Sequence, residues 1–118
     1  EFHKNEKALL DSKRSGFSLE KILAMGKSSY QHLNKPVPIG SEVKLSSDRA
    51  KLDRFGRTLS YLYLNDGTFI NKLMLADGYA YLHTVAPNVQ FKSEFSRAAS
   101  KARRNRAGLW ADVDLDRF

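Results

Sequence analysis

The chain has 118 residues, enough for one domain with a modest core, and its 42% hydrophobic and 28% charged residues argue against wholesale disorder. Its net charge of +7 favours polyanionic partners, nucleic acid first and an acidic membrane second. The lack of cysteine excludes disulfides, thiolate nucleophiles and zinc–thiolate sites, and no apolar run is long enough to span a bilayer.

The N-terminal third of the chain predicts an irregular segment followed by a helix. Residues 1–17 are mostly polar and charged. Ser18 has the chemistry of an N-cap, and apolar residues follow at helical spacing as far as Leu33. Pro36 prevents continuation, because a proline disfavours helical backbone in the residue before it.

Two strands are predicted next, on either side of a charged loop. Residues 41–47 alternate, so that Val43 and Leu45 are expected to point inward. Residues 48–56 form the loop. Residues 57–64 carry apolar side chains on both faces, which is typical of a central strand rather than an edge strand.

The C-terminal half predicts two helices around an extended segment. Thr68 is the expected cap of a short helix, and Gly78 is expected to close it. Residues 79–85 are expected to be extended, and a helix should follow over about residues 90–105, with Trp110 packed back onto the fold. The buried side of the short helix is expected to comprise Phe69, Ile70, Leu73, Met74 and Ala76.

The last helix is strongly basic. Between Phe91 and Arg106 the only acid is Glu94. This composition predicts a face that binds polyanions, although a solvated helix face is the alternative. The basic residues are Lys92, Arg97, Lys101, Arg103, Arg104 and Arg106.

An arginine that follows a glycine turn is the first candidate for chemistry. Arg57 begins the second strand, a rigid mount from which its planar fork of donors could hold two oxygens of a phosphate. The alternative is an ion pair with Asp53 or Asp48. For these two aspartates, pairing with neighbouring arginines is favoured over metal binding, since a hard cation needs several converging oxygens.

Several segments of the chain, and the order in which they occur, resemble staphylococcal-nuclease-type domains (thermonucleases). Residues 53–63, DRFGRTLSYLY, resemble the family strand motif D-[KR]-[YF]-G-R-x-L-[AS]-Y-[IVL]-[YW]. Residues 66–71, DGTFIN, resemble the turn into the family's second helix, and residues 75–80, LADGYA, resemble the end of that helix. Residues 107–110, AGLW, resemble the end of its last helix, and residues 1–3, EFH, resemble the segment after D-T-P in its active-site loop.

The resemblance implies an α+β fold, an OB-type five-stranded barrel with three helices, of which this chain supplies about two strands and the helices. Residues 1–118 would form a single, N-terminally incomplete domain. Residues 1–17 would be its active-site loop, 18–110 its core and 111–118 a tail. The implied activity is calcium-dependent hydrolysis of DNA and RNA phosphodiester bonds, in which a carboxylate activates water and arginines stabilise phosphoryl charge.

Site residues follow from the same resemblance. Arg57 matches a phosphate-binding catalytic arginine and Glu1 the catalytic glutamate, while Arg54 matches a basic residue near a terminal phosphate. Tyr81 and His83 lie near the region where the family carries nucleotide-contacting tyrosines, and Tyr81 could stack on a base or pack in the core. No metal ligand is expected in this chain, because the family's calcium acids precede the position of Glu1.

The family's first three strands also precede that position. We therefore expect the isolated chain to be unstable, domain-swapped or oligomeric unless the missing part is supplied. DNA or RNA is the expected partner and a membrane is not; the resemblance points to a secreted or cell-envelope protein. The alternatives are a catalytically inactive module that binds nucleic acid or protein, and a basic structural fragment.

Overall fold

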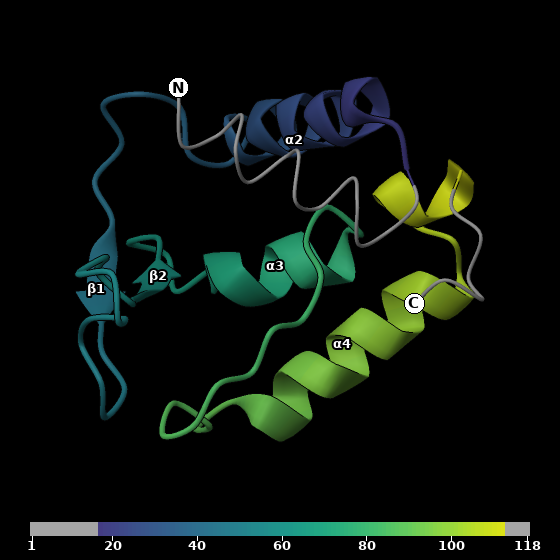
Figure 1. The fold of residues 1–118 in the computed structure, drawn as a ribbon. Coiled ribbons are helices and arrows are strands. Elements are labelled where there is room, and N and C mark those ends of the chain that lie inside the picture. Colours follow the sequence, from purple (N-terminus) through teal and green to yellow (C-terminus); the bar gives the residue numbers. More distant parts are fainter. Residues whose placement is uncertain (1–16, 113–118) are drawn as a thin grey trace. The chain divides into compact units, whose positions relative to one another are not determined.

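The computed structural model describes residues 17–112 (Figure 1). These residues fall into two compact units. The first unit ends at Pro38 and the second begins at Ile39. Helices and a two-stranded antiparallel sheet make this an α+β chain, as predicted. The sheet of the described residues has two strands, so the five-stranded barrel stays a prediction.

The first unit contains helix α2 (Leu19–Leu33), as the apolar spacing predicts. The Ser18 hydroxyl accepts a hydrogen bond from the backbone N–H of Lys21 at 3.1 Å, which confirms the predicted N-cap. Glu20 in the first turn and His32 in the last turn have the order that the helix dipole favours. No helix among residues 17–112 is long and apolar enough to cross a membrane.

The sheet of the second unit is shorter than the sequence predicts. Strand β1 (Lys44–Ser46) pairs antiparallel with strand β2 (Tyr61–Tyr63), and Leu45 lies opposite Leu62. The expectation that Leu45 points inward is wrong, because 63% of this residue is exposed. A neighbouring strand covers the edge of β1 and leaves both of its faces open.

Strand β2 is not central within the described part of the chain, because β1 is its only strand neighbour there. A side chain takes the place of a strand on its other edge. The Leu62 N–H donates to Oδ1 of Asn71 at 2.7 Å, and Nδ2 of Asn71 donates to the Ser60 carbonyl at 3.3 Å. Two of the residues that predicted a central strand, Tyr61 and Tyr63, instead contact phenylalanine rings at the starts of the helices.

A cluster of half-buried aromatic side chains connects elements of the second unit, whose buried hydrophobic residues within 39–112 are Ile70, Leu75 and Ala102. Tyr63 stacks on Phe69 with ring centroids 4.5 Å apart, and Phe91 meets Tyr61 edge-on at 4.8 Å and Phe69 at 4.9 Å. Phe95 also contacts this group, 5.4 Å from Phe69. Edge-on and stacked pairs add to the stabilisation that burial provides. The cluster joins β2 to both helices of the unit.

Helix α3 (Ile70–Ala76) begins without the predicted Thr68 cap. The Thr68 N–H and hydroxyl instead donate to Oδ1 of Asp66, at 2.9 and 2.7 Å, so Thr68 belongs to the preceding turn. Ala76 is exposed, contrary to prediction, and Leu75 is buried. Contacts with both β2 and α4 cover two sides of α3, which a single apolar stripe does not anticipate.

Gly78 ends α3, as predicted. Its φ of +81° and the bonds Gly78 N–H to Leu75 O and Tyr79 N–H to Met74 O form a Schellman motif. The backbone also meets another segment here: a Cβ on Gly78 would collide with the Ala107 carbonyl. The Leu109 N–H donates to the Gly78 carbonyl at 2.9 Å, which docks the C-terminal turn against the end of α3.

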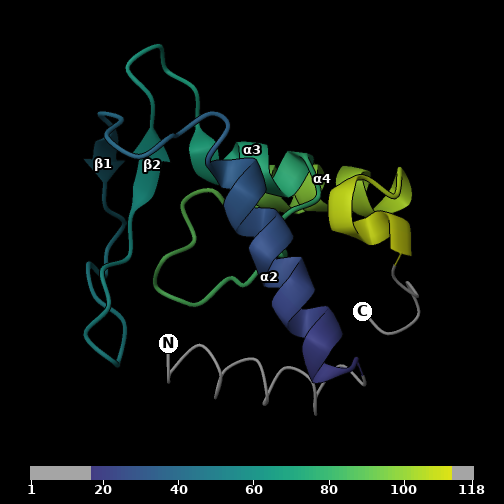
Figure 2. The ribbon, with the colours of Figure 1, turned by 90° about the horizontal axis from the view of Figure 1, so that it is seen from above.

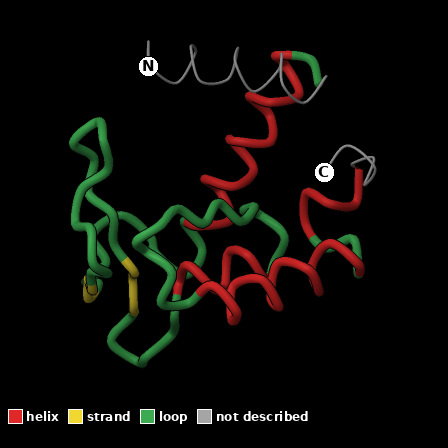
Figure 3. Tube along the Cα trace, turned by 60° about the horizontal axis from the view of Figure 1, so that its bottom comes forward, coloured by secondary structure: helices red, strands yellow, loops and turns green. Residues whose placement is uncertain are grey.

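Helix α4 (Lys92–Arg104) begins slightly later than predicted and lies alongside α3 (Figures 1 and 2). Ala102 is buried, with 3% exposure. A short 3₁₀ helix, η1 (Gly108–Asp112), follows, and the Arg103 guanidinium lies 5.7 Å from the Trp110 ring, so Trp110 packs back as predicted. Much of the second unit is loop, and the predicted extended segment 79–85 makes no strand (Figure 3).

Candidate functional site: a groove beside the Asp53–Arg57 turn

The turn at residues 53–57 is a short hairpin loop. The Asp53 N–H donates to the Arg57 carbonyl at 2.9 Å, and the Gly56 N–H donates to the Asp53 carbonyl at 3.1 Å. Gly56 has a φ of +79°, a left-handed conformation that glycine adopts without steric cost. An aspartate at the start and a glycine at the left-handed position are the residues that such a hairpin requires.

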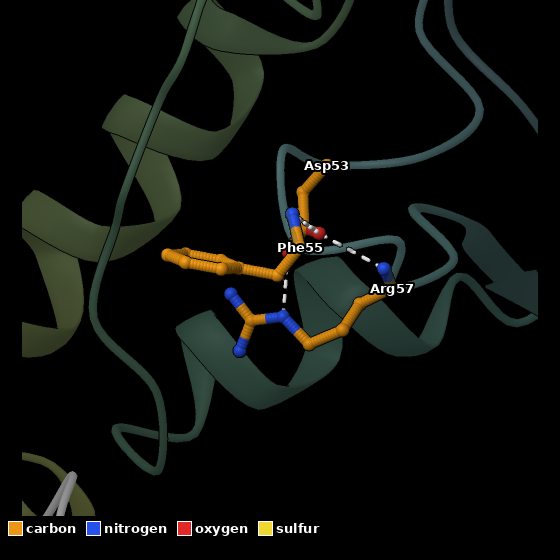
Figure 4. A network of polar contacts seen from close by, with 3 residues as sticks. All are labelled: Asp53, Phe55 and Arg57. Atoms are coloured by element: carbon orange, nitrogen blue, oxygen red, sulfur yellow. Dashed lines mark hydrogen bonds and ion pairs between the residues drawn. The ribbon is translucent and has the colours of Figure 1, made fainter.

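The Asp53 carboxylate organises this loop (Figure 4). Oδ1 accepts the N–H groups of Phe55 at 2.8 Å and Arg57 at 2.9 Å, and Oδ2 accepts from Nε of Arg57 at 2.6 Å. Desolvation acts to raise the pKa of Asp53, but the hydrogen bonds from Arg57 and Phe55 outweigh it and hold that pKa below its ordinary value. Asp53 is therefore charged at neutral pH and holds Arg57 by backbone and side chain together.

Arg57 is paired and exposed at the same time. Its Nε is bonded to Asp53, yet 71% of its side chain is exposed. The carbon at the centre of its guanidinium lies 5.3 Å from the Phe55 ring, and the matching carbon of Arg54 lies 4.8 Å from that ring. Since Asp53 occupies Nε, the two terminal nitrogens remain for a ligand, and these can bind two phosphate oxygens end-on.

A groove of about 810 Å³ opens beside this turn. Its walls come from the loop before β2, from residues 82–88 and from the first turns of α4. The groove brings together three predicted nucleic-acid-binding residues, Arg54, Arg57 and His83. Tyr81 is not among its lining residues and is 62% exposed, so it does not pack in the core. Glu1 lies outside the described residues, and its role stays a prediction.

Asp48 lines the groove and accepts hydrogen bonds from two other segments of the chain. Its Oδ2 accepts from the Tyr61 hydroxyl at 2.6 Å and from the Gln90 N–H at 3.1 Å. The Tyr61 hydrogen bond is the main reason that the pKa of Asp48 lies below its ordinary value. Burial and the neighbouring Asp48 raise the pKa of Tyr61 to about 12, so the phenol stays a donor. The predicted pairing of Asp48 with arginine gives way to a pairing with this phenol and with backbone amides.

Asn88 connects two walls of the groove by hydrogen bonds. The Ala50 N–H donates to Oδ1 of Asn88 at 2.8 Å, and Nδ2 of Asn88 donates to the Ala50 carbonyl at 2.9 Å. One amide side chain thus replaces a pair of strand hydrogen bonds between segments 38 positions apart. The sequence pattern did not indicate this role, because an asparagine after a proline signals only a turn.

The described groove does not fit a calcium site. No group of three or more His, Cys, Asp or Glu residues that could hold a metal occurs within residues 17–112. The two groove carboxylates, Asp48 and Asp53, already accept several hydrogen bonds each. A calcium ion requires about six to eight converging oxygens, which these residues do not present.

Comparison with known proteins places these features in a family. An uncharacterised protein of Bacillus anthracis is 35% identical over 89 residues, 74% of this chain and 41% of that protein. A thermonuclease of Staphylococcus hyicus is 28% identical over 71 residues, 60% of this chain and 41% of that protein. Endonuclease YhcR of Bacillus subtilis is 24% identical over 97 residues, 80% of this chain and 8% of that protein.

The chain thus spans less than half the length of these relatives. The family match, in contrast, covers nearly the whole chain, from residue 8 to residue 112, and includes both the Asp53–Arg57 turn and the basic helix α4. The chain belongs to the staphylococcal nuclease homologue family.

Proposed function

We propose that this chain is part of a nuclease that hydrolyses phosphodiester bonds of DNA or RNA. The observation that carries the proposal is the exposed fork of Arg57, held by Asp53 beside an open groove. Negative charge grows on the phosphoryl oxygens during hydrolysis, and one fixed donor at such a site is worth about 3 kcal/mol. The thermonuclease and endonuclease relatives support the same reaction class.

The groove residues take complementary roles in this proposal. Arg57 binds the phosphoryl oxygens of the reacting group, and Arg54 binds a neighbouring phosphate, with the Phe55 ring beside both guanidinium groups. A water molecule attacks phosphorus and gives its proton to a carboxylate, for which the family resemblance suggests Glu1. The bond to the 5′-oxygen breaks, and that oxygen takes a proton from solvent, so that the cut leaves a 3′-phosphate.

Calcium dependence remains part of the proposal through the family resemblance alone. The described groove residues do not fit a calcium site, so no step is assigned to the ion. The ligands would have to come from residues other than those of the described groove. Chelation is therefore one arm of the experiment that tests the proposal.

A second function, a nucleic-acid-binding module without catalysis, has an observation in its favour. Among the described groove residues, the carboxylates of Asp48 and Asp53 are both committed to hydrogen bonds from protein groups. Neither is therefore free to accept a proton from attacking water. A binding module would keep the arginines and lack the base.

Replacing Arg57 by alanine tests the proposal. Supercoiled plasmid and a single-stranded oligonucleotide are incubated with the protein, with calcium or with chelator. We expect Arg57→Ala to lose about 100-fold or more in cleavage rate, as removal of one oxyanion donor does. Lys51→Ala is the matched control, because Lys51 is an exposed cation outside the groove lining and should leave the rate unchanged. Unaltered cleavage by Arg57→Ala refutes the proposal, and salt-sensitive binding to plasmid that stays intact identifies the binding module.

A further inference from the structure

Helix α4 carries a line of cations that the groove does not use. Arg97, Lys101 and Arg104 recur at helical spacing, so their side chains leave from one face of the helix, and all three are exposed. We call these three residues the basic stripe. Ala102 points to the other side, where the helix is buried. Lys92 at the start of α4 lines the groove and is not part of the stripe.

The basic stripe forms no ion pair with an acid in the described part of the chain. Glu94 is the single acid of α4, and its carboxylate is paired with the Lys72 ammonium at 2.8 Å. No ion pair or hydrogen bond from the stripe side chains occurs within residues 17–112. The stripe is thus a concentrated positive charge that the fold itself does not use.

Its spacing matches a nucleic acid backbone. Arg97 and Arg104 are seven positions apart, which corresponds to about 10 Å along a helix that rises ~1.5 Å per residue. One strand of a duplex carries a phosphate about every 3.4 Å along its axis, so this length faces about three phosphates. A membrane is a poorer fit, because the apolar side of α4 is directed into the aromatic cluster and the Ala102 contacts rather than outward.

We propose that the basic stripe binds the sugar–phosphate backbone of the nucleic acid outside the groove. The inference rests on the proposed function, of which it names a second substrate contact. The stripe contributes affinity and salt sensitivity without sequence preference, because its cations reach phosphates rather than base edges. It takes no part in the chemical step.

The test compares two triple variants of the full chain with the same net charge. One is Arg97→Gln, Lys101→Gln and Arg104→Gln; the other is Lys27→Gln, Lys35→Gln and Lys44→Gln, three exposed cations elsewhere. Binding of a fluorescent single-stranded oligonucleotide is measured by anisotropy in chelator at several salt concentrations. We expect the stripe variant to reduce the slope of log affinity against log salt by about 2, since each lost phosphate contact removes ~0.7. The control should change it by less than half as much.

Equal slope changes in the two variants, or no change in the stripe variant, overturn the inference. Binding to vesicles of phosphatidylserine and phosphatidylcholine is measured in parallel. Loss of vesicle binding by the stripe variant, with oligonucleotide binding intact, also overturns it. Circular dichroism melting verifies that both variants fold. Because binding is measured without cleavage, an inactive protein would refute the nuclease proposal and leave this result standing.

Discussion

The Asp53–Arg57 turn and the basic stripe of α4 use the same kind of side chain in opposite ways. In the turn, Asp53 bonds Arg57 through backbone and side chain, and the Phe55 ring lies against the guanidinium. In the stripe, no described partner restrains the cations. A fixed cation can match one geometry of a reacting phosphate, whereas a cation without a bonded partner responds mainly to charge density. Substitutions in the two regions should therefore affect different observables.

The largest expected difference comes from removing the restraint and keeping the arginine. Asp53→Ala deletes every hydrogen bond that the carboxylate accepts, so the Arg57 fork loses its direction. We expect cleavage to fall by about 100-fold, the cost of a displacement of about 1 Å at a reacting centre. Oligonucleotide affinity should be retained. A variant that keeps the cleavage rate while folding normally by circular dichroism would show that the restraint has no function.

Replacing Phe55 tests whether its ring helps to hold the guanidinium groups of Arg54 and Arg57. Phe55→Leu keeps an apolar side chain and removes the ring, and each contact of a cation with an exposed ring is worth about 0.5–1 kcal/mol. We expect cleavage to fall by about 5- to 30-fold, since both Arg54 and Arg57 lose their contact and the two losses together are worth about 1–2 kcal/mol. Phe55→Tyr retains the ring and is the matched control. Equal losses in the two variants would contradict the assigned role.

A single substitution in the stripe should be milder. Lys101→Gln removes one cation at the middle of the stripe, and we expect the salt slope of single-strand binding to fall by about 0.7. The cleavage rate at saturating substrate should not change, because Lys101 lies outside the groove lining. A changed rate at saturation would place the stripe in the chemistry and end the contrast between the two regions.

The smallest expected effect is on stability in acid. It distinguishes the two regions because the turn contains a titrating carboxylate and the stripe does not. The pKa of Asp53 in the folded chain lies below its ordinary 3.8, so its contribution to stability is present above pH 3.8. This contribution disappears as the pH falls through the folded-state value. Asp53→Asn should flatten the fall of the melting temperature as the pH drops below 3.8, although Asp48 and Asp66 retain their own contributions. The stripe triple variant, which alters no acid, should keep the slope of the parent chain.

Local chemistry predicted much of this fold, and long-range contacts account for the errors. Ser18 and Gly78 act at helix ends, where a side-chain oxygen or a positive φ suffices, and both predictions are confirmed. Thr68 has equally suitable cap chemistry, but Asp66 competes for its hydroxyl. Leu45 is exposed because alternation specifies which residues share a face, while burial depends on what covers that face.

In the candidate site, too, the sequence predicted local contacts and missed long-range ones. The sequence offered an ion pair of Arg57 with Asp53 as the alternative to phosphate binding, and this pair is present because the turn that joins the two residues is local. The phosphate-binding role of Arg57 stays a proposal. The sequence missed Asn88, whose amide reaches Ala50 from 38 positions away and holds the groove walls together. Such contacts depend on the tertiary structure, and nothing in the neighbourhood of Asn88 distinguishes it from any other turn residue.

The backbone contact at Gly78 restricts what this chain can vary. A Cβ on Gly78 would overlap the carbonyl of Ala107, and a Cβ on Gly108 would overlap that of Asp77, whereas one on Gly26 would meet nothing within 4 Å. In a library of substitutions at every position, the clones that fold should contain only glycine at residues 78 and 108. Position 26 should accept most amino acids. The C-terminal turn can thus pack against the end of α3 only because residues 78 and 108 have no side chain.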